Sequence, residues 1–419
     1  MTTNPGVSHE GADFAGADSS NLRRGMHAQA DRVASKVGEP VSAAGAVTIV
    51  AHDIGAVGGM ERVLAELIVG LRARGHDVTV IARTLALASD KGVNFHRVRG
   101  PRRPALIAYP WFMLAGSLTT ARWRRGVVQA TGAIVLNRVD VVAVHYCHQV
   151  GPANPSRSSA LFRLHAAAVG RMLRLAERIC FRANRQAAFV GVSEGVAAEV
   201  REHYPELRER VLSIHNGVDT EGFAPRAREQ EAHARRAQLG IAPDRLVVAF
   251  VGSEWERKGL EPLIRALTSA PGWVVVVAGD GDRLRYQRLA DSLGVGAAVH
   301  WLGVTGDVAL VYSLSDAFVL PSSYETFSLV TFEAAASGLP LLATPVNGVR
   351  ELIDDGRNGF LIDRQPQTIA SRLNQLAEDG ELRARLGACA RSSALAYSWE
   401  EMVAKHERLY ARIRAEREA

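Results

Sequence analysis

The stretch YETFSLVTFEAAASGLPLLATPVNGVRELI, from Tyr324 to Ile353, carries two glutamates, Glu325 and Glu333. Glu325 falls in a turn, and Glu333 falls on the helix that the following residues predict. The small residues Ala334–Gly338 are typical of a helix packed against a sheet, so we expect Glu333 to point into a cleft and not to solvent. Two carboxylates in this arrangement can accept hydrogen bonds from separate hydroxyl groups of one ligand.

Length and composition indicate an ordinary soluble protein with two domains. The chain has 419 residues, of which 47% are hydrophobic and 22% charged, enough to bury two cores. No apolar run approaches the ~18 residues that a membrane span needs, and no secretory signal is recognisable. Three widely spaced cysteines give neither a disulfide framework nor a metal spacing. We therefore expect a cytoplasmic location.

Basic residues are concentrated in the first half of the chain. Between Arg97 and Arg185 there are 15 basic residues and two acids, Asp140 and Glu177. Such a surface predicts an anionic partner. Because no nucleic-acid motif accompanies it, we expect an anionic membrane or a phosphate-bearing acceptor, and no nucleic acid.

The order of strand and helix patterns predicts four regions. Residues 1–44 lack large apolar residues and predict a disordered leader. Residues 45–220 open with a strand, a Gly-rich loop, a helix and a strand, which predicts a parallel doubly wound sheet. Residues 221–395 repeat that pattern after a charged connection, and residues 396–419 predict a helix that braces the first domain. Further strands are expected, among others, at 133–136, 141–144, 246–251, 273–278 and 317–320.

Two loops between a strand and a helix are suited to phosphate. Gly58 and Gly59 let backbone N–H groups approach an anion, although tight turns also need glycine for steric reasons alone. Arg257 and Lys258 combine fixed charge with free backbone donors at a helix start, which suits a leaving diphosphate. A dinucleotide fingerprint is absent, because no third glycine follows at the required spacing.

These motifs together resemble family 4 of the retaining glycosyltransferases. The resemblance rests on the Glu-Thr-Phe-Ser…Glu pattern, the Gly-x-Pro strand, the Asn347-Gly348 loop with Glu351, the His-Asn-Gly-Val-Asp loop and the Arg-Lys-Gly loop. It covers about residues 46–410. It implies the GT-B fold, in which two Rossmann-like domains face a central cleft. The Gly-Ser-x-Trp-x-Arg-Lys-Gly form of one loop is similar to the lipopolysaccharide-core glucosyltransferase branch.

The resemblance also implies roles for single residues. Glu325 would contact the transferred sugar, Glu333 the ribose, and Arg257 with Lys258 the diphosphate. With His145 these residues form the expected catalytic set, and His148 is the alternative to His145. The remaining expected donor contacts are Gly58, Gly59, Ser193, Asn216, Gly252, Ser253, Val304, Thr326, Phe327, Ser328 and Leu329.

Neither of the two metal-like patterns in the sequence is read as a metal site. His145-Tyr146-Cys147-His148 lacks a further ligand cluster. Asp280-Gly281-Asp282 follows a strand as a Gly-rich turn, where Asp and Gly are favoured for structural reasons. We therefore expect no metal and no cofactor beyond the nucleotide sugar, a UDP- or GDP-hexose.

The basic region contains a helical segment and an apolar run. Arg171, Arg174, Arg178, Arg182 and Arg185 recur along one helical face, with Met172, Ala176, Ile179 and Ala183 on another, which predicts a solvated face over a buried one. The apolar run 106–118, which contains Pro110, is flanked by arginines. It predicts either shallow insertion into an anionic bilayer or a core segment.

The expected activity is transfer of a hexose, with retention, from the nucleotide sugar to a hydroxyl of a glycan, lipid-linked or small-molecule acceptor. Such a reaction belongs to cell-envelope or glycoconjugate synthesis. A sugar-nucleotide epimerase or hydrolase on the same fold, or a non-catalytic donor-binding partner, is the alternative. The location would be cytoplasmic, with possible contact to the inner face of the plasma membrane.

Overall fold

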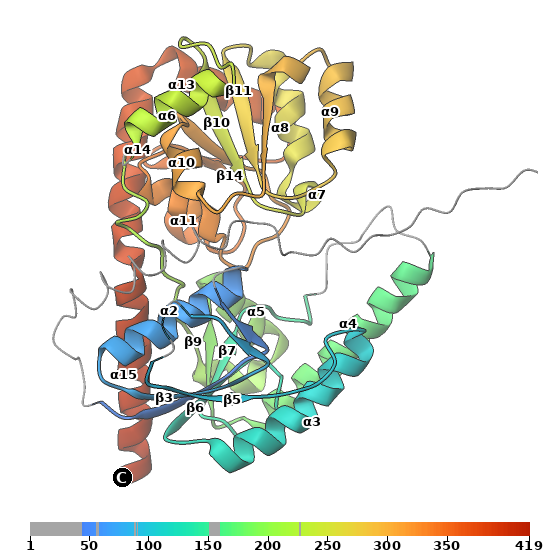
Figure 1. The fold of residues 1–419 in the computed structure, drawn as a ribbon, viewed down its shortest axis with the longest axis vertical. Coiled ribbons are helices and arrows are strands. Elements are labelled where there is room, and N and C mark those ends of the chain that lie inside the picture. Colours follow the sequence, from blue (N-terminus) through green and yellow to red (C-terminus); the bar gives the residue numbers. More distant parts are fainter. Residues whose placement is uncertain (1–43, 56–57, 88, 90, 151–159, 226–227) are drawn as a thin grey trace, which may run out of the picture.

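The computed structural model describes residues 44–55, 58–87, 89, 91–150, 160–225 and 228–419. All but the last residue of the predicted leader lies outside this part of the chain. Figure 1 shows two α/β domains, one above the other, with a long C-terminal helix running along both.

The first domain is built on a parallel sheet of seven strands. Its order is β5-β3-β1-β6-β7-β8-β9, so the chain starts near the middle and winds outward in both directions. The strands are β1 (Ala46–Val50), β3 (Asp77–Ala82), β5 (Val93–Arg97), β6 (Val127–Thr131), β7 (Val141–Val144), β8 (Ala188–Gly191) and β9 (Val211–Ser213). Two short strands, β2 (Asp53–Ile54) and β4 (Thr84–Leu85), pair beside it.

Helices cover both faces of this sheet, because alternate strand residues are apolar on both sides. On one face Ile49 packs with Leu64 and Ile68 of α2 (Gly59–Ala73). On the other face Val50 belongs to a cluster with residues of α3 (Ala105–Trp123), α4 (Ala160–Ala183) and α5 (Glu194–His203), such as Phe112, Phe181 and Val196.

The second domain repeats the architecture with six parallel strands in the order β12-β11-β10-β13-β14-β15. The strands are β10 (Leu246–Val251), β11 (Trp273–Ala278), β12 (Val299–Gly303), β13 (Ala317–Leu320), β14 (Leu341–Ala343) and β15 (Gly359–Leu361). The helices are α6 (Glu229–Gln238), α7 (Trp255–Lys258), α8 (Leu260–Ala266), α9 (Arg283–Ser292), α10 (Val308–Ser313), α11 (Leu329–Ala336), α12 (Val349–Leu352), α13 (Pro366–Glu378) and α14 (Gly380–Ala394).

The last helix, α15 (Trp399–Glu418), returns to the first domain. Val403 lies so close to Gly70 of α2 that a Cβ on this glycine would be 2.5 Å from its side chain. Further along, the Tyr410 hydroxyl donates to Gln129 of β6 at 2.8 Å. The helix therefore covers the first sheet although its residues follow the second domain.

The structure also determines the conformation of two segments of the first domain for which the sequence makes predictions. Residues 133–136 are not a strand: β6 ends at Thr131, and Gly132 takes a positive φ of 69° that breaks the extended run. Ala133, Ile134 and Val135 are buried outside the sheet instead, and Leu136 is exposed. The run 106–118 belongs to α3, with Pro110 inside the helix.

Candidate functional site

The predicted site residues come from the carboxyl ends of parallel strands in both domains. Because strands of one parallel sheet end at the same edge, the loops after β10 and β13 are neighbours. Contacts from these loops to the first domain bring the carboxyl-end edges of the two sheets together.

Glu325 is the centre of a buried charged group. Lys258 Nζ lies 2.9 Å and Arg257 Nη1 3.0 Å from the same carboxylate oxygen, Oε1. The Ser322 hydroxyl donates to that oxygen at 3.0 Å. Burial alone would raise the pKa of Glu325, but Lys258 and Arg257 outweigh it and hold the pKa below its ordinary value. Glu325 is therefore an ionised hydrogen-bond acceptor at neutral pH.

The backbone at three turns brings this group together. Glu254 and Ser328 adopt positive φ angles of 57° and 66°, and each precedes a short helix. Gly259, with φ 83°, ends α7 and starts α8. A Cβ on Gly259 would lie 2.2 Å from the Pro321 carbonyl oxygen, so the two loops touch there.

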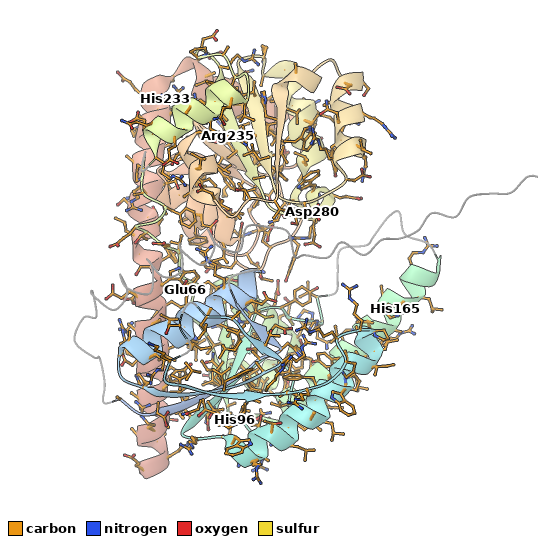
Figure 2. All side chains as sticks on the ribbon, in the orientation of Figure 1. Glu66, His96, His165, His233, Arg235 and Asp280 are labelled. Carbon is orange, nitrogen blue, oxygen red and sulfur yellow. The ribbon has the colours of Figure 1, made fainter. Side chains whose placement is uncertain are left out.

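Glu333 makes a contact between the domains that the sequence did not predict. Arg62 of α2 lies 2.7 Å from Glu333 Oε1, and the Tyr312 hydroxyl donates to Oε2 at 3.2 Å. Burial alone would lower the pKa of Arg62, but Glu333 and then Glu66 raise it above its ordinary value. Glu66 lies one turn further along α2 (Figure 2), and burial raises its pKa to about 7. A ribose bound by Glu333 would share this carboxylate with Arg62.

Other predicted residues also meet across the two domains. The Ser193 hydroxyl, at the start of α5, donates to the Thr326 carbonyl at 2.7 Å. Leu329 Cδ1 would lie 3.6 Å from a Cβ on Gly59. Within the second domain, Gly252 packs on Lys258, whose Cε would be 2.6 Å from a Cβ at that glycine.

Five other predicted residues lie outside the charged group formed by Glu325, Lys258, Arg257 and Ser322. Phe327 is buried and stacks on Phe332 with ring centres 4.2 Å apart. Ser328 binds Thr331 through its hydroxyl, at 2.7 Å. Ser253 and Val304 are exposed after β10 and β12, and Asn216 is buried in the loop after β9.

The two histidines after β7 are both held neutral. Burial, with a smaller effect of His406, lowers the pKa of His145 to about 4. Burial and Arg174 lower the pKa of His148 to about 4 as well. Between them, the Tyr146 ring reaches the second domain, 5.7 Å from the ring of Tyr324.

Two further carboxylates join the domains and were not predicted as site residues. Glu351 of α12 accepts from the Glu194 and Gly195 amides at the N-terminus of α5, at 2.9 and 3.2 Å, and from His215. Glu199 of α5 accepts from Asn347 at 2.7 Å. No sequence signal pairs residues so far apart along the chain.

The Asp280–Asp282 turn follows β11, which ends at Ala278 (Figure 2 labels Asp280). Asp282 caps α9 by accepting from the Arg285 amide at 3.0 Å. Within the described part of the chain, no three His, Cys, Asp or Glu side chains are grouped as metal ligands would be.

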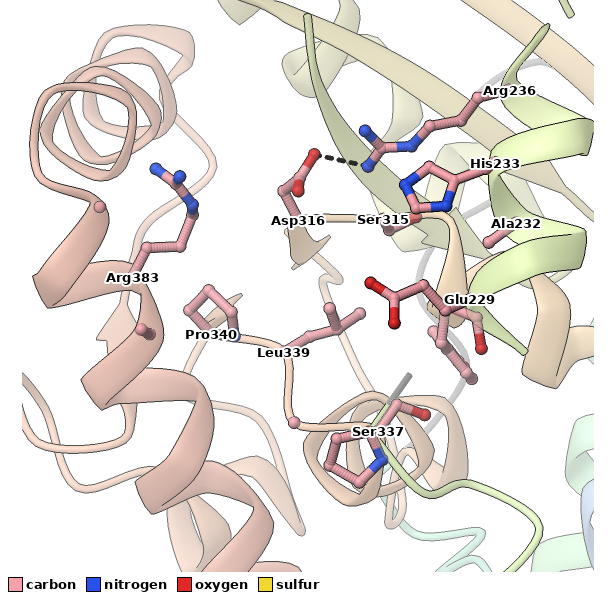
Figure 3. Close-up of a pocket in the computed structure, with 16 residues that line it drawn as sticks. Glu229, Ala232, His233, Arg236, Ser315, Asp316, Ser337, Leu339, Pro340 and Arg383 are labelled. Atoms are coloured by element: carbon pink, nitrogen blue, oxygen red, sulfur yellow. Dashed lines mark hydrogen bonds and ion pairs between the residues drawn. The ribbon is translucent and has the colours of Figure 1, made fainter. Parts of the chain in front are cut away.

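A separate cavity of about 390 Å³ lies in the second domain among α6, α10 and α14 (Figure 3). Arg236 and Asp316, which line it, are paired at 2.7 Å. None of the predicted donor-binding residues lines this cavity.

The fold and the site define a class of protein with two facing Rossmann-like domains. Residues 57–222 match the family described as Glycosyltransferase Family 4, and residues 232–393 match Glycosyl transferases group 1. The two matches together span both domains. The chain therefore belongs to the family 4 glycosyltransferases with the GT-B fold, and this confirms the family resemblance seen in the sequence. The likeness of one loop to the lipopolysaccharide-core branch stays a prediction.

Individual relatives agree with this assignment. The chain is 33% identical to D-inositol 3-phosphate glycosyltransferase of Corynebacterium urealyticum, over 52% of this chain and 55% of that protein. It therefore spans about half the length of this relative. An uncharacterized glycosyltransferase of Methanocaldococcus jannaschii is 27% identical over 84% of this chain and 94% of its own.

Solved structures agree in fold. WaaG, a glycosyltransferase involved in lipopolysaccharide biosynthesis, superposes with a TM-score of 0.70 at 21% identity, over 86% of this chain and 98% of that chain. Anabaena HepE in complex with UDP-glucose has a TM-score of 0.66 at 20% identity, over 86% and 98%. At these identities the likeness concerns the fold alone.

Proposed function

We propose that this chain is a retaining hexosyltransferase. It would move a hexose from UDP- or GDP-hexose to a hydroxyl of a glycan, lipid-linked or small-molecule acceptor, in cell-envelope or glycoconjugate synthesis. The observation that carries the proposal is the convergence of Lys258, Arg257 and Ser322 on one oxygen of Glu325. Family membership and the 33% identical glycosyltransferase support the reaction class.

Glu325 is suited to holding a sugar and not to donating a proton. An ionised carboxylate only accepts hydrogen bonds, and Lys258 and Arg257 keep Glu325 in that form. The hydroxyl groups of the transferred hexose would donate to it. This role keeps the anomeric carbon fixed relative to the acceptor hydroxyl.

Arg257 and Lys258 would neutralise the leaving nucleoside diphosphate. Their charges, together with the amide groups at the start of α2, would stabilise the negative charge as the glycosidic bond breaks. We propose that these groups suffice without a divalent metal and without any cofactor besides the donor.

Attack by the acceptor on the same face as the departing diphosphate would give retention. Glu199 reaches the second domain from the first, but it is occupied by Asn347 and by the Tyr324 hydroxyl at 3.3 Å. This favours direct attack by the acceptor over a covalent sugar intermediate on Glu199. His145 or His148, both neutral at pH 7, would line the sugar from the first domain.

We also propose a cytoplasmic location with contact to the inner face of the plasma membrane. Among the helices that the structure describes, none combines the length and the apolar composition needed to cross a bilayer. Contact with a membrane would involve the surface of the first domain, because 15 basic residues and only two acids lie between Arg97 and Arg185.

The test is product analysis with labelled UDP-glucose and GDP-mannose, each with a chelator or with manganese. We expect a new glycoside with the anomeric configuration of the donor, formed at the same rate in chelator. Free sugar as the main product would favour a hydrolase, and epimerised sugar nucleotide would favour an epimerase. Activity that is lost in chelator and restored by manganese would refute metal independence.

A further inference from the structure

The outer face of α3 carries an apolar stripe that is largely exposed within the described part of the chain, although Trp111 Nε1 donates to the Arg99 carbonyl at 2.9 Å. Ile107, Trp111, Leu114 and Leu118 are 58%, 49%, 58% and 67% exposed. Their spacing of four, three and four residues places them on one side of the helix. An apolar patch of this kind on a surface usually marks an interaction site.

The stripe is held outward by the packing of the opposite side of α3. Ala108, Phe112, Gly116 and Thr120 are buried against the first domain. The Tyr109 hydroxyl also donates to the Ala133 carbonyl at 2.7 Å. The helix cannot turn its exposed side inward without breaking these contacts.

Arginines border the stripe at both ends. Arg102 and Arg103 precede α3, and Arg124 and Arg125 follow it, all exposed. Arg122, on the last turn, lies 5.1 Å above the ring of Trp123. No acidic residue occurs within α3 itself.

Helix α4 packs beside α3 (Figure 1) and presents a similar mixture. Leu175 and Ile179 are exposed together with Arg171, Arg178 and Arg182. The sequence predicted Ile179 and Ala183 on a face separate from the arginines, but both are exposed beside them, so the apolar and basic residues of this helix share one surface. Ala176 is buried as expected.

The two acids of this basic region do not face outward. Glu177 is buried, where it accepts from the Tyr204 hydroxyl at 2.8 Å and the His148 amide at 2.8 Å. Asp140 accepts from the Val128 amide at 2.7 Å and pairs with Arg417. The outer surface of α3 and α4 is therefore positive as well as apolar.

We propose that the outer faces of α3 and α4 dock this protein on a bilayer that contains anionic lipids. The apolar stripe would enter the boundary between head groups and acyl chains, and the arginines would bind the lipid phosphates. Because arginine is also enriched in protein interfaces, self-association is one outcome of the test. None of these residues belongs to the candidate site, and docking on a bilayer does not depend on glycosyl transfer.

The test is co-sedimentation of the full chain with vesicles of phosphatidylcholine, with or without phosphatidylglycerol. We expect binding to the anionic vesicles, weakened by salt. The double change Leu114→Glu and Leu118→Glu should lower the partition coefficient about tenfold or more. Leu284→Glu, at a 68% exposed leucine on α9 of the second domain, is the matched control and should bind as the unchanged protein does.

A second measurement separates a lipid surface from a second copy of the chain. Brominated lipids should quench tryptophan fluorescence, and Trp111→Phe should remove most of that quenching. The proposal is overturned if the double variant binds vesicles normally. It is also overturned if the double variant abolishes self-association in sedimentation velocity and the unchanged protein does not bind the vesicles.

Discussion

Lys258 and Glu325 lie 67 positions apart in the sequence and are both buried, with 2.9 Å between their charged atoms. The sequence predicted both residues in the site, but for different parts of the donor: one for the diphosphate, the other for the sugar. Their pairing depends on β10 and β13 being neighbours, which no local pattern reveals. The Arg62–Glu333 pair was missed because it joins the two domains, and no local pattern reveals that contact either.

Replacing Lys258 by alanine should lower kcat about 10²- to 10³-fold, because a fixed charge at the leaving diphosphate is lost. Glu325→Gln should have a similar effect by weakening the sugar contact. Glu261→Gln is the control, since Glu261 forms an exposed pair with Arg265 in the adjacent helix. Steady-state kinetics with the donor that the product analysis identifies would measure these changes in kcat. Unchanged kcat in Lys258→Ala would show that the diphosphate binds elsewhere.

His406 predicts how stability depends on pH. Burial lowers its pKa to about 4, against 6.5 in the unfolded chain. Between these values the unfolded state binds a proton that the folded state does not, so stability is full above about pH 6.5 and falls toward pH 4. One such group contributes about 3 kcal/mol to this loss.

His406→Gln should therefore reduce the fall in unfolding free energy between pH 6.5 and pH 4, measured by urea unfolding. His145 and His148, whose pKa values are also lowered to about 4, contribute to the remainder. His233→Gln, at an exposed residue of α6 (Figure 2), should run parallel to the unchanged protein. If the His406→Gln curve also runs parallel, His406 is not the group responsible.

At the scale of elements, the long β-branched strands and the helix ends were predictable from local patterns. Two segments were not. Residues 133–136 look like a strand because they are apolar, yet Gly132 takes them out of the sheet. In α3, apolar residues surround the helix, so periodicity could not separate its buried side from its exposed side.

The turn at Gly259 allows an element-scale prediction. Gly259→Ala combines a positive φ with a Cβ 2.2 Å from the Pro321 carbonyl, so the loops that hold Lys258 and Glu325 must separate. Gly240→Ala is the control, because Gly240 has φ 69° and nothing within 4 Å of a Cβ. We expect about 1 kcal/mol of destabilisation at Gly240 and roughly 1–3 kcal/mol more at Gly259.

Only Gly259→Ala should also lower kcat, since only this change displaces the charged group. Thermal unfolding and kinetics of both variants check this. Equal losses of stability in the two variants would mean that the Pro321 contact relaxes without cost.

At the scale of the whole molecule, the alternating strands and helices predicted two Rossmann-like domains because each βαβ unit is local. How the domains contact each other was not predictable, because it rests on single polar pairs such as Ser193–Thr326 and Glu199–Asn347. Each pair joins residues more than 100 positions apart. The sequence predicted a helix at 396–419 that braces the first domain, but not the buried charges through which α15 contacts it.

Glu407 of α15 is fully buried, 3.0 Å from His76 Nε2 and 3.4 Å from Arg74. Glu407→Gln leaves Arg74 without its buried partner and should destabilise the protein by about 3–5 kcal/mol. Glu401→Gln, at a half-exposed residue of the same helix that pairs with Arg408, should cost at most about 1 kcal/mol. Because α15 packs on α2, Glu407→Gln should speed amide hydrogen exchange in both helices and leave β10 and β11 protected. Equal protection of α15 in the two variants would show that apolar packing around Val403 and Tyr410, and not this buried charge, holds the last helix to the first domain.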